Sequence, residues 1–292
     1  MSAIARAFET ARSRKSRIVL PEIFEKRMSE AAHRIREEGI AEPLEPGEIT
    51  SAQVEAIMSV RGAKEGLARR MLQRPLIRAA AMVSAGEADG LVAGIENPTR
   101  RVVEAASLAI GTAPSIQVPS SFFLMTMPDG SEFIFADCAL NVAPEAAQLA
   151  GIAVASARSA ESLLGRAVVA MLSFSTLTSG AGASVDRVKE ATELAVESGV
   201  AAIGPIQADA ALNPEIAKIK QVGGDRPNVL VFPDLDSGNI GYKLVRELAG
   251  ARAVGPFLQG FNKPVCDLSR GASTADIVAA VAVTSALGSE FA

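Results

Sequence analysis

The pattern of apolar and polar positions along this 292-residue chain alternates between two kinds of element. Short apolar runs at residues 17–20, 90–94, 168–174, 201–204, 228–232 and 252–254 predict buried strands. Helical patterns, such as the one over residues 25–38, separate most of these runs. Strands and helices in alternation are typical of mostly parallel sheets whose two faces are both covered by helices. We therefore expect an α/β fold.

One segment departs from this alternation. Residues 122–127 and 132–136 are apolar runs joined through Pro128-Asp129-Gly130, which predicts an antiparallel hairpin. Residues 255–263 are rich in turn residues and lead to Ser269. The chain has no low-complexity linker and is long enough for about two domains of ordinary size. We expect two sheets that face each other across a cleft, and a ligand site in that cleft.

The composition argues against several classes of function. The chain is 49% hydrophobic and 21% charged, with a formal net charge of -4 and a pI near 5.3. No run of lysine and arginine interleaves with aromatic residues, so nucleic acid is not an expected partner. The N-terminus is not an apolar signal, and the apolar run over residues 277–283 is too short to span a bilayer. We expect a cytoplasmic protein with no membrane partner.

The histidine and cysteine content narrows the chemistry. His33 is the only histidine, and it lies off the apolar stripe of its helix, which predicts a surface position. A His-rich metal site is thereby excluded, and a Ser-His or Cys-His nucleophile would need His33. Cys138 and Cys266 are too few for a disulfide framework and lack the spacing of a zinc site. We expect two reduced core thiols and no metal.

The most informative chemical signal is a hydroxyl, a guanidinium and a carboxylate around one turn, supplied by Ser269, Arg270 and Asp276. Arginine holds a phosphate with a planar fork of donors, serine donates to a developing oxyanion, and aspartate exchanges a proton with a leaving group. This combination suits acyl transfer at a phosphate. A structural interpretation stands beside it, because Ser269 can satisfy backbone donors and Asp276 can be a first-turn acid of a helix over residues 274–286.

A loop at residues 173–184 joins a predicted strand to a predicted helix and contains Ser175, Thr176, Ser179 and Gly180. Backbone donors at such a helix start attract phosphate, and glycines permit close approach. The loop is neither a full GxGxxG nor a GxxxxGK[ST] motif. A simple tight turn explains it about as well as a ligand cradle does.

The segment at residues 232–239 follows another predicted strand and opens the helix that carries Tyr242. Asp236 and Asn239 are candidate ligand contacts, because loops after parallel strands commonly line ligand crevices. Aspartate and asparagine are equally ordinary as turn and cap residues.

Two arginines lie at the start of a third predicted helix. We expect Asn97 to be its N-cap and Pro98 its first residue, which places Arg100 and Arg101 in the first turn. The helix dipole disfavours cations there. An anionic ligand would offset that cost.

The chain resembles the phosphate acetyltransferase and phosphate butyryltransferase family along nearly its whole length. The resemblance rests on motifs at residues 17–22 (RIVLPE), 86–94 (GEADGLVAG), 173–182, 232–235 (FPDL), 238–239, 255–256, 260, 263–264 and 267–271 (DLSRG). The acetyl-specific branch is the closer one, chiefly through residues 232–239 and the segment around Ser269.

This resemblance implies reversible transfer of an acetyl group between coenzyme A and inorganic phosphate in a ternary complex, without a metal or a covalent intermediate. Coenzyme A or acetyl-CoA is then a substrate, and no cofactor is bound permanently. The resemblance also implies two three-layer α/β/α domains of the isocitrate/isopropylmalate dehydrogenase type. Residues 1–113 and 253–292 would form the first domain, and residues 114–252 the inserted second, through which a homodimer would form.

The resemblance also assigns roles to single residues. Asp276 matches the family's general base toward the coenzyme A thiol, Ser269 its hydrogen-bond donor to the transition state, and Arg270 a charge stabiliser. Arg61 matches an arginine implicated in substrate binding.

One position departs from the family pattern. Where the family usually has an arginine followed by proline, this chain has Glu104-Ala105, which reverses an expected anion-binding charge. Arg100 or Arg101, about one turn earlier, is the expected substitute.

Two alternatives remain open. A phosphate acyltransferase for propionyl or butyryl groups would share these motifs and differ in pocket volume. A noncatalytic acyl-CoA-sensing domain is a different class of function, which Glu104 favours and the intact Ser269, Arg270 and Asp276 disfavour.

Overall fold

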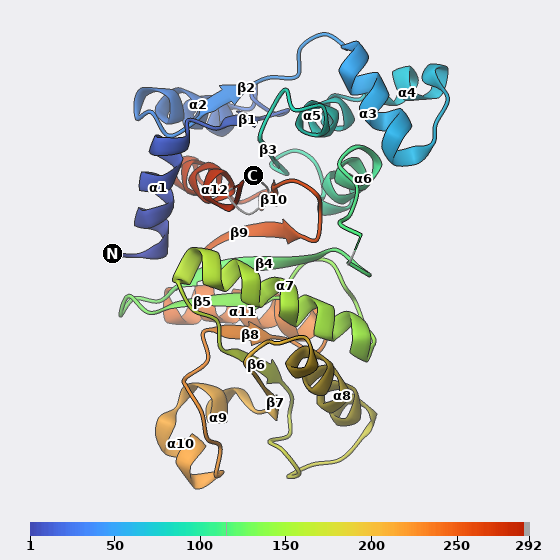
Figure 1. Cartoon of the computed structure of the whole chain (residues 1–292). Helices are drawn as coiled ribbons and strands as arrows, with labels where there is room; N and C mark the ends of the chain where they lie inside the picture. The colour runs from blue at the N-terminus through green and yellow to red at the C-terminus, as the bar shows by residue number, and fades with distance from the viewer. Residues whose placement is uncertain (115, 289–292) are drawn as a thin grey trace. The chain divides into compact units, whose positions relative to one another are not determined.

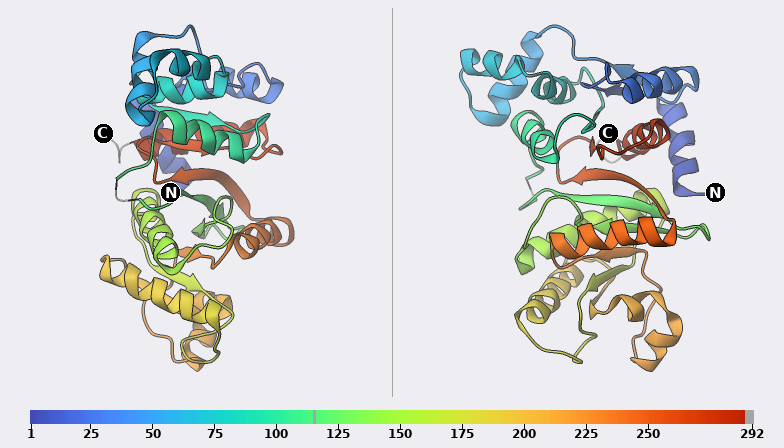
Figure 2. Two further views of the ribbon diagram at one scale, coloured as in Figure 1. Left: turned by 90° about the vertical axis from the view of Figure 1, so that its right-hand side faces the viewer. Right: turned by 180° about the vertical axis from the view of Figure 1, so that it is seen from behind.

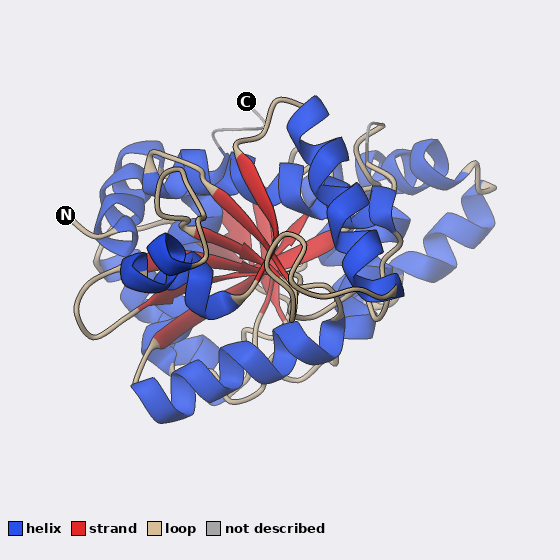
Figure 3. Ribbon diagram, turned by 90° about the horizontal axis from the view of Figure 1, so that it is seen from below, coloured by secondary structure: helices blue, strands red, loops and turns tan. Residues whose placement is uncertain are grey.

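The computed structural model describes residues 1–114 and 116–288, within which the chain forms two compact units. Unit 1 is assembled from both ends of the chain, Met1–Ser115 and Val254–Ala292, and unit 2 from Ile116–Ala253. Each unit has mostly parallel strands with helices outside them (Figures 1 and 3). The predicted α/β class is confirmed.

The sheet of unit 1 brings the carboxyl ends of its parallel strands to one edge. Its strand order is β2 (Glu42–Leu44), β1 (Arg17–Val19), β3 (Gly90–Ala93), β10 (Val265–Asp267) and β9 (Arg252–Gln259). Only β9 runs antiparallel to its neighbour β10 among these pairs in the described residues. Strands β1, β3 and β10 are almost entirely buried, which explains their apolar sequences. Chain segments that leave these three strands therefore lie side by side.

Helices cover this sheet in two groups. Helices α1 (Ala3–Arg14), α2 (Lys26–Glu37) and α12 (Thr274–Leu287) pack together, and α3 (Ser51–Arg61), α4 (Glu65–Leu72), α5 (Pro75–Ser84) and α6 (Thr99–Ala109) form the other group (Figure 1). Helix α12 is buried from Ile277 to Leu287. A helix that is apolar all round belongs in a protein core, so α12 anchors the turn that precedes it.

Unit 2 has the strand order β4 (Ser120–Thr126), β5 (Glu132–Ala136), β8 (Val229–Val231), β6 (Val169–Leu172) and β7 (Ala202–Ile206). Strands β4 and β5 pair antiparallel, which confirms the predicted hairpin, and the other pairs are parallel. Helices α7 (Ala146–Leu164) and α8 (Ala183–Glu197) cover one face and α11 (Leu235–Ala249) the other (Figure 2). The short helices α9 (Ala208–Leu212) and α10 (Pro214–Ile219) follow β7.

One predicted loop is largely a strand. Residues 255–263 were expected to be turn-rich, but β9 continues through Gly255-Pro256 to Gln259. Phe257 and Leu258 are buried and pair with Cys266 and Val265 of β10. Burial of these apolar side chains outweighs the turn preference of the Gly-Pro pair, and the turn is confined to the residues between β9 and β10.

The histidine and the cysteines lie where their sequence contexts predict. His33 is exposed on α2, with Nδ1 3.3 Å from a carboxylate oxygen of Glu37. Cys138 and Cys266 are buried free thiols, and burial raises the pKa of each well above its usual value. Neither thiol is therefore placed as a nucleophile.

Candidate active site

The buried carboxylate of Glu22 organises the loop that leaves β3. Oε2 accepts hydrogen bonds from the N–H groups of Gly94 and Ile95 at 2.8 and 3.0 Å. Oε1 accepts from the N–H groups of Glu96 and Asn97 and from the Asn97 amide, at 3.0, 2.9 and 2.7 Å. Five donors on one carboxylate fix the path of the chain between β3 and α6.

Asp267 ends β10 directly beside this loop. The residue is 1% exposed, and its Oδ1 has no hydrogen-bond partner within residues 1–114 and 116–288. The pKa of Asp267 is raised to about 7, mainly by burial. A hydrogen bond with Thr99 acts to lower this pKa, and the negative charge of Glu22 acts to raise it. A Cβ on Gly94 would lie 2.5 Å from Asp267 Oδ1, and Gly94 has φ 115°, so only glycine fits there.

The turn after Asp267 presents the predicted catalytic residues. Ser269 and Arg270 are both exposed. The Ser269 carbonyl accepts from the Ala272 N–H at 2.9 Å, and its hydroxyl accepts from the Gly271 N–H at 3.3 Å. The expectation that Ser269 satisfies a backbone donor is thus met. The hydroxyl hydrogen takes no part in that contact, so Ser269 can still act as a donor.

Asp276 lies in the first turn of α12 and forms a capping box with Ser273. Asp276 Oδ2 accepts from the Ser273 hydroxyl at 2.7 Å and from the Ser273 N–H at 3.1 Å. In return, the Asp276 N–H donates to the Ser273 hydroxyl at 3.2 Å. Asp276 therefore has the structural function that its sequence context allowed. The cap fixes its carboxylate at the start of the helix that follows Ser269 and Arg270.

Arg100 and Arg101 are exposed in the first turn of α6, but the predicted cap is wrong. The N-cap is Pro98, and the helix begins at Thr99. The side-chain amide and the N–H of Asn97 both donate to Glu22. The buried carboxylate thus fixes Asn97 in the loop that precedes the helix.

The charge that departs from the family pattern is paired inside unit 1. Glu104 accepts two hydrogen bonds from the guanidinium of Arg74, each at 3.0 Å. The hydrogen bond with Arg74 is the main reason that the pKa of Glu104 lies below its usual value. Glu104 thus remains ionised and is neutralised locally.

The candidate substrate-binding arginine of α3 lies at the end of its helix. Arg61 is exposed and is followed by Gly62, which ends α3 in the left-handed conformation with φ 62°. Arg61, Arg100 and Arg101 all belong to unit 1 and to the same helix group.

In unit 2, the loop at residues 173–182 is held by its own hydroxyls. Ser175 and Thr176 are buried. Ser175 Oγ lies 3.3 Å from Ser179 Oγ, which accepts from the Thr176 N–H at 2.9 Å. Thr176 Oγ1 donates to Gln207 at 3.0 Å. Gly180 packs closely against Phe174 and Ser175, since a Cβ there would lie 3.1 Å from each. These contacts indicate an ordered turn, in which Thr178 and Ser179 are exposed residues that carry a hydroxyl group.

The two candidates at the start of α11 differ in their surroundings. Asp236 is exposed in the first turn. Asn239 donates through its amide to the carbonyl of Cys138 at 3.0 Å and so ties α11 to the segment after β5. The cap itself is made by Asp234, which accepts from the N–H and the hydroxyl of Ser237 at 2.8 and 2.7 Å.

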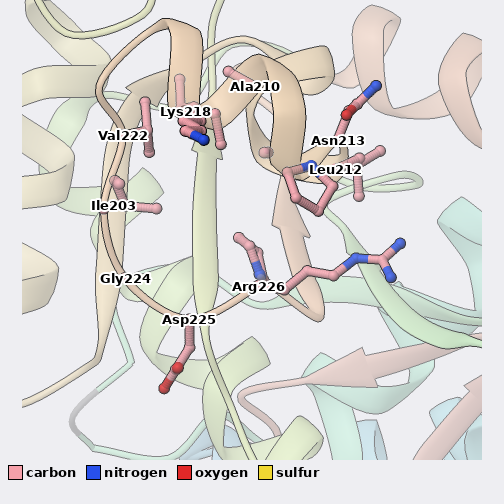
Figure 4. Close-up of a pocket in the computed structure, with 15 residues that line it drawn as sticks. Ile203, Ala210, Leu212, Asn213, Lys218, Val222, Gly224, Asp225 and Arg226 are labelled. Atoms are coloured by element: carbon pink, nitrogen blue, oxygen red, sulfur yellow. The ribbon is translucent and has the colours of Figure 1, made fainter.

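Unit 2 also contains a cavity of about 400 Å³ beside β7, α9 and α10 (Figure 4). Its wall is mainly apolar, with Ile203, Leu212 and Val222. It also carries the charged residues Lys218, Asp225 and Arg226. The residues that line it include none of the predicted site residues.

Within the described parts of the chain, no group of three or more His, Cys, Asp or Glu side chains is placed to hold a metal ion. No helix in the same residues combines the length and the apolar character that a membrane crossing requires.

The structure adds residues to which the sequence pattern assigned no role: Glu22, Arg27, Arg74 and Asp267. Glu22 follows a buried strand and Asp267 ends one, and a charged residue in such a position is a usable signal for a site at the sheet edge. Arg27 and Arg74 carried no such signal, because their partners are distant in sequence.

The fold and the turn together define an α/β protein that presents a serine, an arginine and an aspartate at the carboxyl edge of a parallel sheet. A protein of this class, with an arginine and a serine at the edge of the sheet, is suited to bind an anionic ligand. The sequence matches the phosphate acetyl/butaryl transferase family over residues 48–285, and the chain belongs to that family.

Individual relatives agree with this assignment. The chain is 42% identical to a phosphate acetyltransferase from Thermoanaerobacterium thermosaccharolyticum, across 97% of this chain and 98% of the relative. Its structure is similar to that of a phosphotransacetylase from Streptococcus pyogenes, with a TM-score of 0.91, 36% identity and coverage of 99% and 98% of the two chains. A EutD phosphotransacetylase from Staphylococcus aureus gives a TM-score of 0.86 at 35% identity, with coverage of 98% and 99%.

Proposed function

We propose that this chain is a phosphate acetyltransferase, which transfers an acetyl group reversibly between coenzyme A and inorganic phosphate. The observation that carries the proposal is the 42% identity to a phosphate acetyltransferase over nearly the full length of both chains. The turn with Ser269, Arg270 and Asp276 supports it, because it holds the three types of group that this chemistry needs.

In the direction that consumes acetyl-CoA, an oxygen of the phosphate dianion attacks the thioester carbonyl carbon. Ser269 and Arg270 stabilise the negative oxygen of the tetrahedral intermediate. The carbon–sulfur bond then breaks, and acetyl phosphate forms. The proton that phosphate carried passes through Asp276 to the departing sulfur, so the products are acetyl phosphate and the free thiol. In the reverse direction, Asp276 removes the thiol proton.

The proton transfer needs help from the site. An ordinary aspartate has a pKa of about 3.9 and a cysteine-like thiol about 8.5, so moving the proton unaided from thiol to carboxylate costs roughly 6 kcal/mol. A guanidinium beside the thiolate lowers the thiol pKa. We assign this effect to Arg270, which lies three residues before Ser273, the cap residue that holds Asp276.

Release of free thiol from acetyl-, propionyl- and butyryl-CoA, with and without phosphate, tests the proposed function. Phosphate-dependent release with acetyl-CoA as the best substrate is expected. A preference for butyryl- or propionyl-CoA would favour the alternative acyl group. Binding of acyl-CoA without phosphate-dependent release would instead indicate the sensor.

The role of Asp276 leads to a kinetic prediction. Asp276→Asn is expected to lower turnover at least a hundredfold, of the order that general acid–base catalysis contributes, with the Michaelis constants of both substrates within about threefold. Asparagine still offers an oxygen to Ser273, so the cap is largely kept. Initial rates over a grid of both substrate concentrations measure the effect.

The matched control is Ser273→Ala, which removes the capping hydroxyl and keeps the Asp276 carboxylate. It is expected to cost about 1 kcal/mol of stability. It is also expected to lower turnover far less than Asp276→Asn does, because the Ser273 N–H still donates to the Asp276 carboxylate. An equal loss of turnover in both variants, or large equal rises in both Michaelis constants for Asp276→Asn, would contradict the proton-transfer role.

Binding of the anionic substrates is the proposed role of the remaining candidates. In unit 1 we assign it to Arg61, Arg100 and Arg101, which are exposed. The Arg74 pair that neutralises Glu104 supports this assignment, because the acid then presents no unpaired charge to phosphate. In unit 2 the proposed substrate contacts are Ser175, Thr176, Ser179, Gly180, Asp236 and Asn239.

We further propose that the protein is a homodimer formed through unit 2. Helix α11 supports this proposal because Ile240, Leu244 and Leu248 recur every four residues and are 56%, 52% and 82% exposed. Such a stripe on one helical face is typical of an interaction surface.

Leu244→Glu is therefore expected to convert a wild-type dimer into a monomer, because it buries a charge in the middle of that stripe. Light scattering after size exclusion at several concentrations measures the mass. Leu67→Glu is the control, because Leu67 is a similarly exposed leucine, 45%, on α4 of unit 1. A monomeric wild type, or a dimer that survives Leu244→Glu, would contradict the proposal.

We also propose that the two units are structural domains, with residues 114–252 as the inserted one. The compact units, which divide after Ser115 and after Ala253, support these boundaries. The cytoplasmic location stays a prediction from the sequence.

A further inference from the structure

Arg27, the second residue of α2, contacts the turn that carries Ser269 and Arg270. Its Nη1 donates to the backbone carbonyl oxygens of Arg270 and Ala272, at 2.9 and 2.8 Å. Its Nε donates to Glu25 Oε1 at 2.9 Å. Glu25 is itself fixed, because its Oε2 accepts from the Met28 N–H at 3.1 Å and caps α2. The start of α2 thus fixes the Arg27 guanidinium, and this guanidinium in turn fixes the turn at residues 269–272.

The two carbonyls lie on either side of Gly271, which is the point of greatest freedom in the turn. Glycine has no Cβ and reaches backbone conformations that other residues avoid. The bonds within the turn, from Ala272 N–H and Gly271 N–H to Ser269, are both made to one residue and are local. The two hydrogen bonds from Arg27 Nη1 tie both flanking peptide groups to another element. It therefore limits the rotation that would redirect Ser269 and Arg270.

A second contact from the same helix acts in the same direction. Thr274, the first residue of α12, donates through its hydroxyl to Glu30 of α2 at 3.1 Å. Helix α2 thus holds the chain on both sides of Ser273, whose cap fixes Asp276. The side chains of Arg27 and Glu25 are only 34% and 19% exposed. Solvent therefore weakens the Arg27–Glu25 ion pair less than it weakens a pair on the surface.

We infer that Arg27 is a positioning residue of the acetyl transfer reaction: anchored by Glu25, it holds the Arg270 and Ala272 carbonyls and thereby orients Ser269 and Arg270. This inference rests on the proposed function. Arg27 touches no reacting atom in this role. Its contribution lies in the fraction of time that the hydroxyl and the guanidinium spend in the reactive arrangement, which affects turnover more than binding.

The test compares Arg27→Met with Arg34→Met in the full-length enzyme. Methionine keeps much of the arginine stem and removes all donors. Arg34 is the matched control, because it lies on the same helix and pairs with Glu38 on the surface. Arg27→Met is expected to lower turnover at least tenfold, with both Michaelis constants within about twofold, whereas Arg34→Met is expected to match the wild type. Arg27→Lys, which retains a cation and donors, is expected to recover at least threefold of the loss.

Amide hydrogen exchange of residues 270–273 gives a readout that does not depend on activity. Exchange there is expected to rise at least fivefold in Arg27→Met and to stay unchanged in Arg34→Met. If Arg27→Met does not fold, Glu25→Gln takes its place, because it leaves Arg27 intact and weakens its anchor. Glu25→Gln is expected to shift turnover and exchange in the same directions by about threefold.

The outcomes separate the inference from the proposed function. A wild type without phosphate-dependent thiol release refutes the function, and the role in transfer with it, while the exchange data still report whether Arg27 holds the turn. An active wild type with unchanged exchange or full turnover in Arg27→Met overturns the inference. So does a loss that appears in the Michaelis constants, or one that Arg27→Lys does not relieve.

Discussion

Replacement of Glu22 by alanine is expected to lower the free energy of unfolding by about 3–5 kcal/mol. The carboxylate accepts five hydrogen bonds, four of them from consecutive backbone N–H groups of Gly94 to Asn97. Glu22 is 4% exposed, so the abandoned donors do not all regain water. A buried donor without a partner costs about 1–3 kcal/mol, and such costs are not additive. The stated range reflects two or three donors left unsatisfied.

The loss is expected to reach the proposed site as well. The loop that Glu22 holds leads directly into the turn of α6 with Arg100 and Arg101. It also contains Gly94, against which Asp267 and Leu268 pack. Release of this loop therefore loosens both the helix start with Arg100 and Arg101, the proposed anion-binding residues, and the strand end before Ser269. We expect a weaker affinity for phosphate in the variant at temperatures where it is still folded.

Urea denaturation measures the change in stability, and two further variants make the result specific. Glu22→Gln keeps one acceptor oxygen but turns an NH2 group toward N–H donors, so an intermediate loss is expected. Glu48→Ala removes an exposed glutamate of the same unit and is expected to stay within about 0.5 kcal/mol of the wild type. A Glu22→Ala protein within 1 kcal/mol of the wild type would show that water replaces the carboxylate at little cost.

The sequence predicted strands correctly where burial on both faces of the sheet requires a continuous apolar run. Strands β1 and β3 follow this rule, and each was predicted to within one residue of its observed end. Strands β2 and β10 were not predicted, because proline in one and aspartate in the other interrupt the apolar pattern. Strand β9 was cut short because Gly255-Pro256 has the local chemistry of a turn.

The site was predictable to the extent that its contacts are local. Ser269, Arg270 and Asp276 lie within eight positions, and their capping geometry follows from sequence spacing. The support around them is not local. Glu22 is 72 to 75 residues from the groups it holds, and Arg27 is 243 and 245 residues from the carbonyls it contacts. Residue spacing along the chain carries no information about such pairs.

The contribution of Asp267 to the stability of the protein is expected to fall as the pH rises from about 4 to 7, because its carboxyl group ionises. The pKa of this carboxyl is raised to about 7, mainly by burial. A group whose pKa is higher in the folded state contributes its full stabilisation below its ordinary pKa and loses it as the pH rises through the folded value. A shift of about three units corresponds to about 4 kcal/mol, which is an upper limit. The measurement is the free energy of unfolding in urea at a series of pH values.

Asp267→Asn should remove this dependence, since an amide keeps the shape of the neutral acid and does not ionise. The difference in the free energy of unfolding between the variant and the wild type is expected to shift by about 2–4 kcal/mol in favour of the variant from pH 4 to pH 8. Asp89→Asn gives the opposite sign as a control. Burial raises the pKa of Asp89, but hydrogen bonds and charge from Arg17 outweigh it, so the pKa is lowered. The stabilisation by Asp89 is therefore present at neutral pH and is lost on acidification. A pH-independent difference between Asp267→Asn and the wild type would contradict a buried titrating carboxyl at the strand end that leads into the catalytic turn.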